Sequence, residues 1–258
     1  MVVWAGNSPE GPAGGATYNP DTNRWRRLPN GPLGPREGYV SAWTGRELLI
    51  LGGHTGQVAT PTAATVNPRT GAWRELRSLK DVRSLASAQG AVWDGHEALV
   101  SGNGTLFAVN PVADTARAIS LAPAPIDSRQ RSHLNPIAWT GREVIFWAQA
   151  EMSSPIGVVG YNPATGRWKK TGAAPCAGSS QVAWVGNRLI AACGTYGLQI
   201  YAPATNSWST VRSGRSPLNS REQSAIAWSG TDLIVWSGAV HEPGNPTPAE
   251  GASITLED

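Results

Sequence analysis

Arginine-glutamate dipeptides mark two corresponding places in the chain. Arg36 is followed by Glu37 and Arg221 by Glu222, and each arginine stands seven residues before the tryptophan of a W-x-G turn. A guanidinium offers a planar fork of donors that fits a carboxylate, sulfate or phosphate. The alternative is that each arginine binds its neighbouring glutamate or loop carbonyls and so holds the fold together. Two further arginines, Arg83 and Arg131, are expected on the same surface of the fold as Arg36 and Arg221. Gln149 and Glu151 are expected there too, as possible partners for sugar hydroxyls.

Three histidines form a second candidate site. His54, His133 and His241 fall in alternate copies of the repeat described below. Three imidazoles that converge would make a zinc or copper site. The alternative is that they are solvated loop side chains, because the chain lacks H-x-H, H-E-x-x-H and C-x-x-C. Phosphate-cradling G-x-x-x-x-G-K and nucleophilic G-x-S-x-G motifs are also missing, so no cofactor is expected.

A repeat positions these residues. The phrase IAWTGREVIFWAQ at 137–149 returns as IAWSGTDLIVWSG at 226–238, and related phrases recur at intervals of 44 to 50 residues. Each copy holds two apolar runs separated by W-x-G, which predicts an antiparallel hairpin of strands A and B with glycine at positive φ in the turn. We expect the aligned tryptophans to pack one copy against the next. They are Trp43, Trp93, Trp139, Trp184 and Trp228.

A second phrase predicts two more strands in each copy. YNPDTNRW at 18–25 returns at 66–73, 161–168 and 201–208, with a decayed copy at 109–116. Proline at the first turn position and asparagine or glycine at a left-handed position predict a tight turn between strands C and D. Four antiparallel strands in each copy, with no helical pattern between them, predict an all-β fold. The repeat therefore indicates a β-propeller of four-stranded antiparallel blades.

The repeat resembles the Kelch motif. The resemblance rests on Arg36 near the start of strand A, the pair Gly52-Gly53 after strand B, and VNPRTGAWREL at 66–76. It covers essentially the whole chain, although the full glycine pair survives in one copy only. It implies a single domain over 1–258, similar to the central domain of galactose oxidase and to bacterial Kelch proteins. Kelch propellers include both binding modules and unrelated enzymes, so the resemblance does not indicate which of these functions the fold carries.

The blade boundaries follow from the alignment. Full blades are predicted at about 36–79, 83–121, 131–171 and 177–212, and partial blades at 1–30 and 220–258. There are six blade positions if the partial blades stay separate, and five if they merge. An unpaired strand edge is available for pairing, so we expect ring closure or self-association through the incomplete blades.

Loop lengths predict which face carries the function. The D-to-A and B-to-C loops share one face, and the tight A-to-B and C-to-D turns share the other. Because sites gather on long loops of rigid scaffolds, we expect the first face to bind. We predict a non-catalytic recognition module for a glycan, an anionic small molecule or a protein. Two alternatives stay open: a mutarotase-like or isomerase-like sugar-processing enzyme that uses Arg131 or Arg221 with Glu151 or Glu222 at a central pocket, and a metal-dependent enzyme that uses the loop histidines.

Composition limits the partners and the compartment. The net charge is +3, only 15% of residues are charged and no Lys/Arg block stands out, so no nucleic-acid partner is expected. No apolar run is long enough for a membrane span. No signal peptide is visible, but the resemblance to exported bacterial Kelch proteins implies an extracytoplasmic or secreted location. The predicted hairpin separates Cys176 and Cys193 by about 13 Å, which favours two free thiols.

Overall fold

Strands dominate the protein. The computed structural model describes residues 1–4, 14–19, 21–148, 157–172, 181–192, 198–211, 221–222, 225–228, 231–236, 239–240 and 251–255. The predicted all-β class is confirmed over these residues, which hold several four-stranded antiparallel sheets. The chain forms two compact units: unit 1 is Met1–Ala122 with Leu134–Pro136, and unit 2 is Pro123–His133 with Ile137–Asp258. The predicted single domain stays a prediction.

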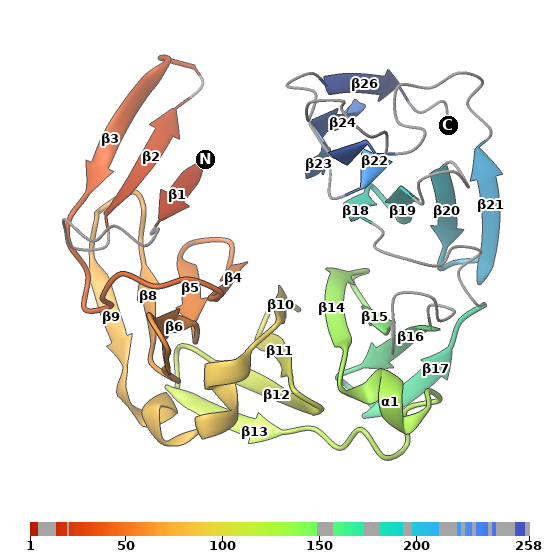
Figure 1. The fold of residues 1–258 in the computed structure, drawn as a ribbon, viewed down its shortest axis with the longest axis horizontal. Helices are drawn as coiled ribbons and strands as arrows, with labels where there is room; N and C mark the ends of the chain where they lie inside the picture. Colours follow the sequence, from red (N-terminus) through yellow and green to blue (C-terminus); the bar gives the residue numbers. More distant parts are fainter. Residues whose placement is uncertain are drawn as a thin grey trace. The chain divides into compact units, whose positions relative to one another are not determined.

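Unit 1 contains three successive sheets, each with its strands in chain order (Figure 1). The first is three-stranded, because the described chain supplies strands B, C and D. The second and third have the predicted A-B-C-D order. The strands of the three sheets are, in order, β1 (Val2–Trp4), β2 (Gly15–Asn19) and β3 (Arg24–Leu28); β4 (Val40–Trp43), β5 (Leu48–Leu51), β8 (Ala63–Val66) and β9 (Trp73–Leu76); and β10 (Gly90–Trp93), β11 (Ala98–Gly102), β12 (Thr105–Asn110) and β13 (Thr115–Ala118).

Unit 2 continues the same plan. It contributes two four-stranded sheets and one three-stranded sheet of strands A, B and C. Strands β22 (Arg221–Glu222) and β25 (Ala239–Val240) form an additional short pair. The strands of the three sheets are, in order, β14 (Leu134–Trp139), β15 (Val144–Ala148), β16 (Gly157–Asn162) and β17 (Arg167–Lys170); β18 (Gln181–Val185), β19 (Arg188–Ala192), β20 (Leu198–Ala202) and β21 (Ser207–Val211); and β23 (Ala225–Trp228), β24 (Asp232–Trp236) and β26 (Gly251–Thr255).

The A-to-B turns have the geometry that W-x-G predicts. Gly45 and Gly141 lie at φ +87°, a region that side chains other than glycine rarely adopt. The residue before each glycine fixes the turn through its side chain. The Thr140 Oγ1 atom accepts from the Glu143 N–H at 3.0 Å, and the Asp94 carboxylate does the same for Glu97 at 2.7 Å. Side-chain acceptors of this kind replace backbone bonds in tight turns.

The C-to-D turns are built by the asparagine of the N-P-x-T phrase. The Asn67 Oδ1 atom accepts from the N–H of Arg69 at 2.9 Å, and Asn162 accepts from Ala164 at 3.0 Å. The predicted left-handed positions are confirmed, and Asn206 occupies one of them at φ 53°. The tyrosine that begins the phrase then pairs with the tryptophan that ends it on the neighbouring strand. Tyr161 and Trp168 have ring centroids 4.8 Å apart, and Tyr201 and Trp208 have theirs 5.2 Å apart.

Successive sheets within each unit pack face to face and bury aliphatic side chains between them. In unit 1, Leu49 and Leu51 of β5 share a buried cluster with Val100 of β11. In unit 2, Trp147 of β15 shares one with Leu189 of β19. Every one of these side chains is at least nine-tenths buried. Burial of each stabilises the fold by about 1.5 to 3 kcal/mol, so the sheet-to-sheet contact is a main source of stability.

Tryptophans contribute to these contacts, but the repeated ones do so unequally. Trp93 and Trp184, which end strands A, pack against the clusters between sheets as predicted. Trp43 is 48% exposed. Two tryptophans of strand D, Trp73 and Trp208, make a contact that the sequence did not predict. The Trp73 Nε1–H donates to the Pro29 carbonyl of the preceding sheet at 2.9 Å, and Trp208 donates to Gly172 at 3.0 Å.

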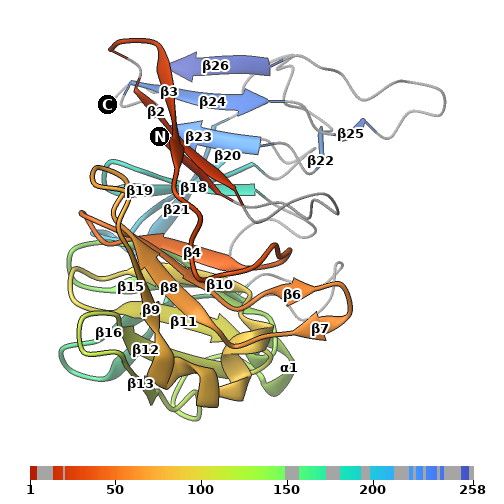
Figure 2. The same cartoon turned by 90° about the vertical axis from the view of Figure 1, so that its left-hand side faces the viewer.

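Short elements lie in the connections where the sequence predicts only loops. The D-to-A connection of the second sheet forms two 3-10 helices, η1 (Arg77–Asp81) and η2 (Arg83–Ser87), which bury Leu79 and Leu85. The hairpin β6 (His54–Thr55) and β7 (Val58–Ala59) extends beyond the end of the same sheet (Figure 2). In unit 2, α1 (Ser128–Arg131) begins with a capping box between Asp127 and Gln130.

None of the described helices is long and apolar enough to cross a bilayer.

Candidate functional site

Arg36 lies inside unit 1, not on its surface. Its side chain is among the buried polar groups at 4% exposure. The guanidinium donates to the carbonyls of Gly34 at 3.2 Å, Gly52 at 3.0 Å and Thr62 at 3.3 Å, and to the Thr62 hydroxyl at 3.0 Å. Burial also lowers the pKa of this guanidinium. The structure therefore favours the alternative that Arg36 ties loop carbonyls together, because its side chain is buried and its donors are engaged by these loops.

Glu37 and His54 lie side by side at the end of the second sheet. Their backbones exchange two hydrogen bonds of 2.9 Å, and the Glu37 carboxylate lies 3.8 Å from His54 Nε2. The two side chains are 53% and 45% exposed. Gly53, at φ +88°, makes this approach feasible because a Cβ there would lie 2.6 Å from the Glu37 carbonyl oxygen. The pair is accessible, but Arg36 points away from it into the protein.

The remaining candidates are dispersed over the two units. Arg83 is exposed at the start of η2 in unit 1. In unit 2, Arg131 ends α1, His133 is exposed just after it, and β22 carries Arg221 and Glu222. Their convergence on one surface stays a prediction. Three candidates, Gln149, Glu151 and His241, lie outside the described residues, as do Cys176 and Cys193.

The histidine metal site is equally untested. Over the described ranges, no group of three or more His, Cys, Asp or Glu side chains is placed to hold a metal ion. His54 belongs to unit 1 and His133 to unit 2, and His241 is not described. His96, which the sequence places in an A-to-B turn, is exposed there.

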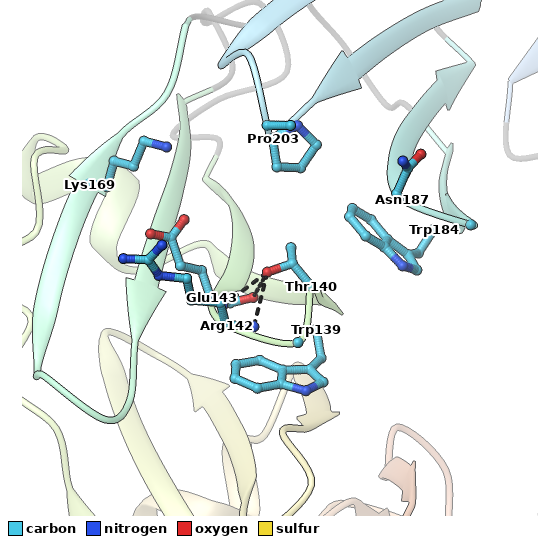
Figure 3. A pocket seen from close by; sticks show the side chains of 11 residues that line it. Trp139, Thr140, Arg142, Glu143, Lys169, Trp184, Asn187 and Pro203 are labelled. Atoms are coloured by element: carbon cyan, nitrogen blue, oxygen red, sulfur yellow. Dashed lines mark hydrogen bonds between the residues drawn. The ribbon is translucent and has the colours of Figure 1, made fainter. Parts of the chain in front are cut away.

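A cavity of about 640 Å³ lies in unit 2, on the side of the tight turns (Figure 3). Its walls come from two neighbouring sheets. The sheet of β14 to β17 supplies its A-to-B turn and a strand D side chain, and the sheet of β18 to β21 supplies both of its turns. The lining residues are Trp139, Thr140, Gly141, Arg142, Glu143, Lys169, Trp184, Gly186, Asn187, Pro203 and Ala204.

The lining combines aromatic and charged groups. Trp139 and Trp184 are half-buried, so each has an indole surface in contact with the protein and another part that is accessible. Arg142 and Lys169 are exposed, and Glu143 lies between them in Figure 3. Asn187 adds an amide that can both donate and accept. A flat apolar ring beside several donors and acceptors suits a ligand with both apolar and hydroxylated surfaces.

Glu143 is held in place from its backbone. Thr140 exchanges hydrogen bonds with Glu143, since its N–H and hydroxyl donate to the Glu143 carbonyl at 3.0 and 3.1 Å. The carboxylate lies over Gly160 of β16, where a Cβ would be 3.0 Å from Oε2. Its charge also reaches Tyr201. Burial first, and the Glu143 carboxylate second, raise the pKa of the Tyr201 phenol to about 12.

Sequence reasoning missed this cavity because it judged each turn by its own length. The turns are tight as predicted, but the space lies between the turns of neighbouring sheets. A signal was present in the aligned repeats. The first turn of one lining sheet reads T-G-R-E and that of the other V-G-N-R, and Arg142 and Glu143 of the former line the cavity together with Asn187 of the latter.

Unit 1 has a cavity of about 620 Å³ at the corresponding place in the repeat. Trp43 and Pro68 there correspond to Trp184 and Pro203 in unit 2. Its other walls combine the apolar Met1, Val2 and Leu48 with polar residues of β2 and with Arg69. The amino group of Met1 donates to the Tyr18 carbonyl at 3.0 Å. Of the two cavities, the one in unit 2 is lined by side chains of both charges, since it contains Glu143 as well as Arg142 and Lys169.

No family model matches the chain, and neither does any curated protein.

Proposed function

We propose that the protein is a non-catalytic carbohydrate-recognition module built from Kelch-like propeller blades. Three observations support the blades: the repeat of 44 to 50 residues, the A-B-C-D strand order, and the face-to-face packing of successive sheets within each unit. The two units would then supply five or six blade positions of one ring.

The cavity of unit 2 carries the functional proposal. Trp139 and Trp184 border one opening together with Arg142, Glu143 and Asn187. An indole face covers the apolar face of a sugar ring, and the surrounding polar groups bind its hydroxyls. The two tryptophans come from equivalent positions of successive sheets, so the repeat itself spaces them.

Recognition suits this lining better than hydrolysis. Glycoside hydrolysis commonly uses two carboxyl groups, one on each side of the scissile bond. Within the described lining, Glu143 is the carboxylate. The hydroxyl of Thr140 fixes the backbone of Glu143, so the turn presents the carboxylate at the cavity as a hydrogen-bond acceptor for a ligand hydroxyl.

The test is a glycan array with the purified chain, followed by calorimetry on the best ligands. We expect Trp139→Ala and Trp184→Ala each to weaken binding at least about tenfold, since stacking against an aromatic side chain contributes about 1 to 3 kcal/mol. Trp25→Ala is the matched control, because Trp25 is 56% exposed in unit 1 and lies outside the cavity. Equal binding by the variants and the control, all folded by circular dichroism, would contradict the proposal.

A further inference from the structure

The residue after the strand D tryptophan ties neighbouring sheets together in unit 1. Arg74 donates to the Pro111 carbonyl in the C-to-D turn of the next sheet at 2.6 Å. Arg26, one sheet earlier, donates to the carbonyls of Pro68 and Arg69 in the equivalent turn. The arginine at this position therefore spans the space between two sheets.

The arginine at this position also contacts the glutamate of the A-to-B turn in its own sheet. Arg74 lies 3.4 Å from the Glu47 carboxylate, and Arg117 of the third sheet lies 2.6 Å from Glu97. The register explains both pairs, because Arg74 pairs with Thr65 and Arg117 with Ala108 at the same level of their sheets. The glutamates of these two turns are thus neutralised within their own sheets.

Lys169 occupies this position in unit 2. It pairs with Gly160 on β16, at the level that Thr65 and Ala108 occupy in unit 1. The residues that correspond to the partners of Arg74, Glu47 and Pro111, are Glu143 and Pro203 here. Lys169, Glu143 and Pro203 all line the cavity. Within the part of the chain that the structure describes, the Lys169 ammonium makes no hydrogen bond or ion pair with either of them. In Figure 3 the lysine lies at the upper left and the proline at the upper centre, and no interaction is drawn between them.

The lysine keeps the positive charge of the arginine but changes the shape of the group that carries it. Its side chain ends in one ammonium, whereas arginine ends in a wider planar fork with five donors. The groups that arginine would tie together therefore stay apart and border the cavity. Arg142 adds a second exposed cation, so the lining carries two positive side chains and one negative. An anionic group on the ligand would balance the excess positive charge.

We infer that the cavity selects carbohydrates that carry negative charge, with Lys169 binding the anionic group. This inference rests on the proposed carbohydrate function and adds the ligand class. The indoles would hold the ring, Glu143 and Asn187 the hydroxyls, and the ammonium a carboxylate or a sulfate. Both anions present oxygen acceptors to the three donors of an ammonium, so the experiment separates them.

Calorimetry on the full chain with matched sugars tests the inference. The probes are trigalacturonate, its methyl ester, and a galactose trisaccharide with and without 6-O-sulfate. We expect the wild type to prefer at least one charged sugar over its neutral partner. Lys169→Ala should weaken binding of that sugar about tenfold and change the neutral partner by less than about twofold, because a charge-assisted hydrogen bond is lost.

Lys170→Ala is the matched control. Lys170 is the next residue of β17, is also exposed, and lies outside the cavity lining. The variant removes the same charge from the chain, so it measures any effect of net charge alone. Equal losses in Lys169→Ala and Lys170→Ala would overturn the inference. So would a wild type that binds charged and neutral sugars equally, which would leave the proposed carbohydrate function intact. Failure to bind any sugar would contradict the proposed function itself.

Discussion

Arg36 shows how one buried side chain can hold several connections in a unit. Its guanidinium reaches the segment before strand A through Gly34, the end of strand B through Gly52, and the start of strand C through Thr62. The Gly34 and Gly52 carbonyls lie outside the paired strands and need donors from elsewhere, while the Thr62 carbonyl also accepts from the Gly52 N–H at 3.1 Å. Arginine is suited to this role because it presents five donors in fixed directions.

Arg36→Ala should therefore destabilise the fold. We expect the free energy of unfolding to fall by about 2 to 4 kcal/mol, because the hydrogen bonds of a buried guanidinium to Gly34, Gly52 and Thr62 are lost together. Urea denaturation followed by tryptophan fluorescence measures this loss. Arg83→Ala is the control, and since Arg83 is exposed we expect a change within about 0.5 kcal/mol. A stable Arg36→Ala variant that loses only an anionic ligand would restore Arg36 as a binding residue.

The sequence predicts the conformation of some residues but not the surroundings of others. The W-x-G glycines and the asparagines of N-P-x-T were predictable, because a turn of a few residues determines their conformation. The burial of Arg36 was not, because its acceptors at Gly52 and Thr62 are brought to it by the folding of strands B and C. The role of Lys169 was not predicted for a similar reason. It can be recognised only by comparison with the arginines that occupy the same position in other sheets.

At the scale of the element, the turn between β20 and β21 connects the fold of one sheet with the cavity. The Tyr201 hydroxyl donates to the Asn206 Oδ1 atom at 2.9 Å, and Asn206 holds the left-handed position of the turn. Burial and the nearby Glu143 carboxylate disfavour the tyrosinate. The neutral phenol is thus part of the folded turn.

Tyr201 should make the stability of the fold depend on alkaline pH. Its pKa is raised from 10.0 to about 12 in the folded protein. The folded state therefore binds more protons than the unfolded state between these pH values, and stability falls as pH rises through this window. Tyr201→Phe should flatten the loss measured by urea denaturation at several pH values. Tyr18→Phe is the control, because it removes the equivalent bond to Asn23, and an equal flattening in both variants would contradict the assignment.

Strand order was the most predictable property of the elements. Each A-B-C-D sheet follows from two turn phrases with apolar runs between them, and the structure has the first and last described sheets as B-C-D and A-B-C. The helices η1 and η2 were not predicted, because their segment has no long helical periodicity. They form because Leu79 and Leu85 reach the cluster between two sheets.

At the scale of the molecule, the proposed propeller predicts cooperative unfolding. If both units belong to one ring, a destabilising change in either unit should move the same transition. We expect Arg36→Ala in unit 1 and Trp208→Phe in unit 2 each to lower the midpoint of a single calorimetric peak. Trp208→Phe removes the bond to the Gly172 carbonyl, a loss of about 1 kcal/mol. Two separate peaks, of which each variant moves one, would indicate independent domains.

The indole-to-carbonyl bonds of Trp73 and Trp208 have a consequence for how such a chain can change over evolutionary time. Each bond links a copy to the one before it. The link is not made in the decayed copy, which has Ala116 at this position, nor at Trp168, whose Nε1 atom has no hydrogen-bond partner among the described residues. Where the bond exists, insertion or deletion of a whole copy would leave each donor next to an acceptor, whereas loss of half a copy would remove one of the two groups.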